Sequence, residues 1–81
     1  MSDWLDDAIA RLASRARLDV TDLRLTDDER TTILALAGYA AHESGARVNA
    51  PLLCYLLGRA SATGVTVEEL SDALLGSDAE R

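Results

Sequence analysis

The sequence predicts an all-α fold, a compact four-helix domain with a central hairpin of helices two and three. Apolar residues make up 48% of the 81 residues but aromatic residues only 4%, so leucine and alanine have to form most of the core. Only six residues are valine or isoleucine, which gives β-strands poor support. Apolar residues instead recur at helical spacing in four segments, and residues that cap helix ends separate these segments.

Size, charge and cysteine content limit the classes of protein to which this chain can belong. The 81 residues form one domain, expected over 1–76 with a disordered tail at 77–81, and a domain this small gains stability from oligomerisation. The net charge of −6 argues against binding to a nucleic-acid backbone. A single cysteine permits no internal disulfide, and neither a leader nor a long apolar run is present. We therefore expect a cytoplasmic protein that does not span a membrane.

The first helix is predicted from Asp3 to Ala16, with Ser2 as its N-cap and acidic residues in its first turn. Five apolar residues recur on one face and are expected to be buried: Leu5, Ala8, Ile9, Leu12 and Ala16. Trp4 falls at the edge of this face. We favour the interpretation that its ring covers the end of the bundle, and the alternative is that it anchors an interface.

Residues 17–25 alternate apolar and polar positions, but a strand here would have no partner. We interpret them as an extended connector held by leucines, with at most one turn at Thr21–Leu23. The second helix begins at a capping box formed by Thr26 and Glu29 and runs to about Glu43. Its expected buried face comprises Ile33, Leu34, Ala37, Ala40 and Ala41, with Leu36 beside it, and its opposite side comprises Thr31, Ala35, Gly38 and His42.

The third helix is predicted from its N-cap Asn49 to Ala62, with Pro51 in the first turn, where a missing N–H costs nothing. Its apolar residues span a wide arc, formed by Leu52, Leu53, Leu56, Leu57 and Ala60 and widened by Cys54 and Gly58. A helix that is apolar over most of its circumference is either central in the fold or shared with a second subunit.

The fourth helix follows Gly64, which is expected to end the third. It begins at a second capping box, formed by Thr66 and Glu69, and stops at Gly76. Its inward face is expected to comprise Val67, Leu70, Ala73 and Leu74.

The corner between the second and third helices holds the clearest candidate for a binding site. His42, near the end of one helix, most simply caps its carbonyl groups. Alternatively, His42, Arg47 and free N–H groups at Asn49 and Ala50 bind an anion, such as a phosphate-containing small molecule, because helix N-termini favour anions. No residue set predicts a metal, a cofactor or a catalytic nucleophile, and His42 as a general acid or base is the least favoured interpretation.

A second group of residues is a candidate protein interface. Cys54 lies among leucines, and we expect it to pack as an inert thiol. Tyr39 and Tyr55 fall on the less apolar sides of their helices, where they are either half-buried rings or, with His42 and Arg59, the lining of a partner groove. The hypothetical interface consists of Trp4, Tyr39, Cys54, Tyr55, Gly58 and Arg59.

Several short motifs resemble a known family. They are Trp4-Leu5, Ala41-His42, the run from Arg47 to Leu52 that ends in Ala-Pro-Leu, and Leu56 to Gly58. Over about residues 3–75 the chain resembles small actinobacterial helical domains of unknown function, which occur alone or fused to the C-terminal side of a molybdenum cofactor guanylyltransferase. The family pattern marks Trp4, His42, Arg47, Ala50, Pro51 and Gly58, although the spacing from His42 to Arg47 is one residue longer here.

These observations favour a non-catalytic accessory or interaction domain. We expect a homodimer that uses the apolar face of the third helix, or a complex with a partner protein, and the resemblance implies a link to molybdenum cofactor biosynthesis. The alternative function is a small anion- or nucleotide-binding domain that uses His42, Arg47 and the N–H groups after Asn49. Neither nucleic acid nor a membrane is expected as a partner.

Overall fold

The computed structural model describes residues 4–76, and within this range it contains helices and no strand. The helices are α1 (Trp4–Ala16), α2 (Val20–Leu23), α3 (Asp27–Ser44), α4 (Asn49–Ser61) and α5 (Val67–Leu75). The all-α prediction is therefore confirmed, but the number of helices is five rather than four. The predicted start of the first helix at Asp3 with its Ser2 cap, and the predicted tail at 77–81, lie outside the described residues.

Two helix starts are set by local sequence, as predicted. The hydroxyl of Thr26 accepts the N–H of Glu29 at 3.0 Å, and the carboxylate of Glu29 accepts the N–H of Thr26 at 2.8 Å. Thr66 and Glu69 repeat the arrangement at the start of α5, at 3.0 and 2.9 Å. Each capping box satisfies two N–H groups that a helix start leaves unpaired. Gly76 ends α5 in the left-handed conformation, so its predicted role as a stop is confirmed.

The additional helix is α2, a single turn within the residues that were predicted to form an extended connector. The carboxylate of Asp22 accepts the N–H of Asp19 at 3.0 Å, which closes the turn across three residues. Just before it, the N–H of Leu18 donates to the carbonyl of Ala13 at 2.8 Å, which ends α1 in a Schellman motif. Arg17 occupies the left-handed position of this motif, with φ of 62°, where glycine is the usual residue.

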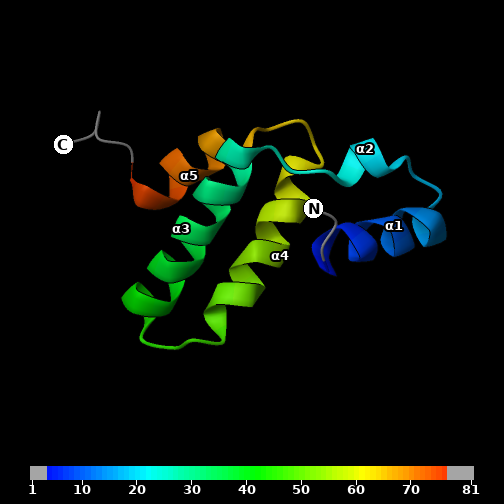
Figure 1. Ribbon diagram of the computed structural model, residues 1–81. Helices are drawn as coiled ribbons and strands as arrows, with labels where there is room; N and C mark the ends of the chain where they lie inside the picture. The colour runs from blue at the N-terminus through cyan, green and yellow to red at the C-terminus, as the bar shows by residue number, and fades with distance from the viewer. Residues whose placement is uncertain (1–3, 77–81) are drawn as a thin grey trace.

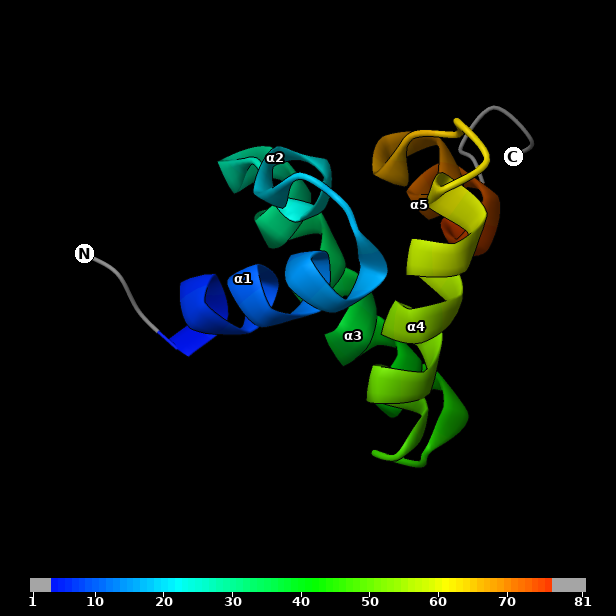
Figure 2. The same ribbon diagram turned by 90° about the vertical axis from the view of Figure 1, so that its right-hand side faces the viewer.

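The helices form two groups, which we call the body (α3, α4 and α5) and the arm (α1 and α2). In the body, α3 and α4 form an antiparallel hairpin, confirming the predicted central hairpin, and α5 packs on both of them (Figure 1). In the arm, α1 packs on α2, and its Cα atoms come within 8 Å of no other described helix. Figure 2 shows α1 running across the direction of the hairpin. None of the described helices is long and apolar enough to cross a membrane.

The buried core of the described residues is small. It comprises Ile9, Ala13, Leu36, Ala40, Leu57 and Val67. In α3, Leu36 is only 1% exposed, whereas Leu34, which was predicted to face inward, is 66% exposed. The expected buried face of this helix is therefore confirmed at Ala40, which is buried, and wrong at Leu34, because the covered side is centred closer to Leu36. α4 and α5 both pack against α3, and they cover the side of α3 that carries Leu36.

The buried face of α1 also differs from the prediction. Ile9 is buried as expected, but the buried residue one turn later is Ala13, and Leu12 is 62% exposed. Ala16 is exposed as well. The physical reason is that α1 packs beside the short α2 rather than on the larger body, so the end of its apolar stripe at Leu12 and Ala16 lacks a cover.

Candidate functional site

The corner between α3 and α4 is organised by Ser44. Its hydroxyl donates to the carbonyl of Ala40 at 2.6 Å and accepts the N–H of Ala46 at 3.2 Å and the side-chain amide of Asn49 at 2.9 Å. Asn49 is thus the first residue of α4 and not its N-cap, which is Val48. The prediction fails because the side chain of Asn49 turns back to α3 instead of accepting N–H groups of its own helix.

The N–H groups proposed to bind an anion already have acceptors. The N–H of Asn49 donates to the carbonyl of Ala46 at 3.1 Å, and the N–H of Ala50 donates to the carbonyl of Arg47 at 3.0 Å. The side chains of His42 and Arg47 are exposed. No hydrogen bond or ring contact among the described residues joins them. Anion binding at this corner stays a prediction, without a contact that favours it.

Potential metal ligands do not gather in residues 4–76. No three His, Cys, Asp or Glu side chains of this range lie close enough to hold a metal ion. Cys54 is a free, half-buried thiol. It lines a cleft of about 710 Å³ between the arm and the body, together with Arg24, Leu57 and Gly58. This cleft also includes the capping residues Glu29 and Thr66, whose polar atoms are already used in the starts of α3 and α5.

The most exposed apolar surface of the body is one side of α4, which we call the α4 outer face. It consists of Val48 just before the helix and of Leu52, Tyr55, Leu56 and Arg59. The four apolar side chains are between 55% and 67% exposed. The guanidinium of Arg59 lies 5.7 Å from the centre of the Tyr55 ring, a cation–π distance across one helical turn. The structure therefore brings together two of the predicted interface residues, Tyr55 and Arg59.

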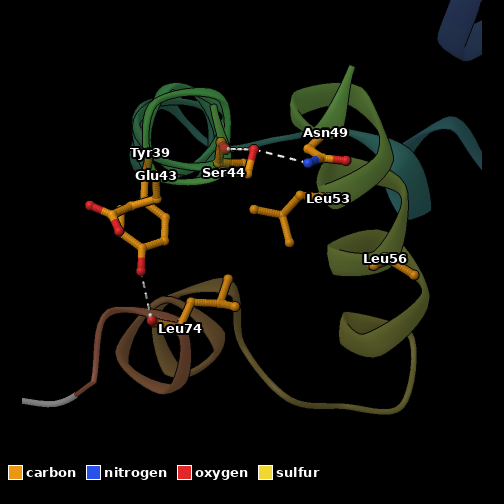
Figure 3. Close-up of a pocket in the computed structure, with 8 residues that line it drawn as sticks. Tyr39, Glu43, Ser44, Asn49, Leu53, Leu56 and Leu74 are labelled. Atoms are coloured by element: carbon orange, nitrogen blue, oxygen red, sulfur yellow. Dashed lines mark hydrogen bonds between the residues drawn. The ribbon is translucent and has the colours of Figure 1, made fainter. Parts of the chain in front are cut away.

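A groove of about 370 Å³ opens on the adjacent side of the body, and we call it the body groove. It is lined by Tyr39, Ala40, Glu43, Ser44, Asn49, Leu53, Leu56 and Leu74. Figure 3 shows Leu53 and Leu74 pointing into the space between the three helices. The hydroxyl of Tyr39 donates to the carbonyl of Leu74 at 3.3 Å, which ties α3 to the end of α5 (Figure 3). Glu43 is the one charged residue among the lining residues.

Sequence reasoning placed Tyr39 among the interface candidates but missed the groove around it. A signal was present in the spacing of caps and stops. The fourth predicted helix is confined between Thr66 and Gly76, whereas the second is about twice as long. A helix of that length cannot cover the whole hairpin of the other two helices, so part of the hairpin's inner surface had to remain open.

The remaining predicted interface residues lie apart from one another. Trp4 is 80% exposed on the arm, so the interpretation that its ring covers the end of the bundle is wrong. It borders a hollow between α1 and α3 with Leu25 and Leu34, two further exposed leucines. Cys54 and Gly58 line the cleft between arm and body, away from Tyr39 in the body groove. The six candidates therefore belong to several surfaces rather than to one.

Comparison with known proteins gives one match. The model of a domain family of unknown function, DUF6457, matches residues 1–80, which is nearly the whole chain. No curated protein and no solved structure matches. A family of unknown function is what the sequence motifs led us to expect. The chain belongs to the DUF6457 family.

Proposed function

We propose that this chain is a non-catalytic interaction domain that binds a protein partner through the α4 outer face. One observation carries the proposal: four large apolar side chains of this face are each more than half exposed, in a chain with a very small core. Contiguous exposed apolar surface on a soluble domain is typical of an interaction site. Tyrosine and arginine, which lie together at Tyr55 and Arg59, are the side chains that most often dominate binding energy at interfaces.

The charges around this face indicate the chemistry of the partner. α4 carries no acidic residue, while Arg59 lies on its outer face and Arg47 lies just before its start. A complementary surface is therefore apolar with carboxylates at its rim. Contact between two α4 outer faces would instead bring arginines of both copies together, so the partner at this face is a different protein.

The resemblance to domains fused to molybdenum cofactor guanylyltransferase supplies a named partner for this proposal. A domain that is fused to an enzyme in some proteins and separate in others is a candidate to bind that enzyme when separate. This link rests on association and not on a mechanism. The proposal includes a cytoplasmic location, where the free thiol of Cys54 stays reduced.

The test is a titration of the purified chain with the molybdenum cofactor guanylyltransferase from the same genome, followed by isothermal calorimetry. We expect binding, and we expect Leu52→Asp to weaken it at least about tenfold, because a charge would enter the centre of an apolar contact. Leu34→Asp is the matched control. It changes a similarly exposed leucine, 66% against 59%, on α3 rather than on the α4 outer face, and it should leave binding unchanged.

Two results would contradict this proposal. If the wild-type chain does not bind the enzyme at high micromolar concentration, the enzyme is not the partner. If both variants weaken binding equally, the α4 outer face is not the binding surface. Circular dichroism of each variant shows whether its helix content is retained, so that loss of binding is not confused with loss of folding.

A further inference from the structure

The body groove is open because α5 is short. α5 has nine residues, against 18 in α3 and 13 in α4. At about 1.5 Å per residue, α5 spans roughly half the length of α3. It covers one half of the hairpin and leaves Leu53 and Leu56 beside an open space in the other half (Figures 1 and 3).

Within residues 4–76, no helix other than α3, α4 and α5 contributes to this groove. All residues that line the groove belong to α3, α4 and α5, and none belongs to the arm. Residues 77–81 have the sequence Ser-Asp-Ala-Glu-Arg, which contains one apolar residue. They lack the side chains that an apolar groove would take up.

The arm carries an exposed apolar surface that matches the apolar lining of the body groove. Trp4, Ala8 and Leu12 recur every four residues on one side of α1, and Trp4 and Leu12 are 80% and 62% exposed. This stripe is as long as two helical turns, which suits the uncovered half of the hairpin.

The charges of the two surfaces are also complementary. Arg11, Arg15 and Arg17 share one surface at the end of α1 with Ala10 and Ser14, without an acidic residue. Their guanidinium groups have no partner among the described residues. The groove carries the opposite charge, in the carboxylate of Glu43. α1 as a whole is neutral, because Asp6 and Asp7 in its first turn balance Arg11 and Arg15. The attraction is therefore local, between the arginine-bearing end of α1 and the carboxylate of Glu43.

We propose that the body groove is the docking site for α1 of a second copy of this chain. In the resulting homodimer each copy inserts its α1 into the groove of the other, so that Leu12 fills the space beside Leu53 and Arg15 lies near Glu43. The contact is made twice, once on each side of a two-fold axis. The inference rests on the proposed function in treating the chain as an interaction domain. The body groove adjoins the α4 outer face and shares Leu56 with it, whereas Leu52, Tyr55 and Arg59 do not line the groove.

The experiment is a charge reversal measured by analytical ultracentrifugation from low to high micromolar concentration. The wild type should sediment as a species of twice the 8.7-kDa mass. Arg15→Glu and Glu43→Arg should each weaken dimerisation about tenfold or more, because each sets like charges against one another. The double variant should restore dimerisation. Arg24→Glu and Asp72→Arg are controls of the same charge change outside the contact, and neither should alter the dimer.

A second measurement uses Trp4, the one tryptophan of the sequence. Its fluorescence should shift to shorter wavelength as the dimer forms, because the exposed ring becomes buried. A wild type that is monomeric at every concentration would overturn the inference, and so would a dimer that neither charge reversal weakens. The two proposals predict different results for binding of the guanylyltransferase. Leu52→Asp should abolish this binding, whereas Arg15→Glu should leave it unchanged. Failure of one proposal is therefore distinguishable from failure of the other.

Discussion

The arm and the body are built from similar helices, yet they bury their apolar residues to very different extents. α1 has 13 residues and α4 has 13. α4 packs against both α3 and α5, whereas α1 packs against α2, a single turn. In the body, Leu36 is almost fully enclosed, while in the arm Leu12 and Trp4 remain largely in solvent.

This difference shows that the apolar pattern of a helix does not by itself create a core. An amphipathic stripe is stabilising only when another element covers it, because most helical stability in proteins comes from packing of that face. In the arm the cover is incomplete within one chain. Our proposal of a homodimer treats the uncovered stripe and the uncovered half of the hairpin as two parts of one contact.

The largest expected effect concerns the centre of the body. Leu36→Ala should lower the free energy of unfolding by about 3–5 kcal/mol, because it leaves a cavity where α4 and α5 meet α3. Leu34→Ala, on the exposed side of the same helix, should change it by about 0.5 kcal/mol or less. Urea denaturation followed by circular dichroism measures both. Equal losses in the two variants would mean that the buried face of α3 is the one predicted from the sequence.

A smaller effect is expected in the arm. Arg17→Gly should stabilise α1 by about 0.5–1 kcal/mol, because glycine adopts a positive φ without a steric cost. Since α1 packs on α2 alone, amide hydrogen exchange should slow in α1 while the rates in α3 and α4 stay the same. Arg24→Gly, at a position with φ of −69°, is the control and should bring no gain. Slower exchange throughout the chain would show that the arm and the body unfold as one unit.

The smallest expected effect is at the corner between α3 and α4. Because the N–H groups of Asn49 and Ala50 already donate to carbonyls, millimolar phosphate should not raise the melting temperature of the wild type. A ligand at about 100 times its Kd would stabilise the chain by about 2.7 kcal/mol, so binding would be easily seen. An increase that disappears in Arg47→Ala would restore the anion-binding alternative.

What the sequence by itself determined is local. The capping boxes at Thr26 and Thr66 and the stop at Gly76 follow from interactions between residues a few positions apart, so the residue types alone predict them. The short turn at α2, Val20–Leu23, was expected only as an option at Thr21–Leu23 within an extended connector, because four residues show no helical period. Its signal was the pair Asp19 and Asp22, three positions apart.

What only the tertiary structure decided is which face of each helix is covered and which residues meet. Leu34 and Leu36 are equally apolar and differ by about 200° around α3, and the side taken by α4 and α5 determines which one is buried. The N-cap assigned to Asn49 failed because Ser44, on another helix, competes for its side chain. The body groove likewise depends on where α5 ends in space, because side chains distant in the sequence become neighbours only through packing.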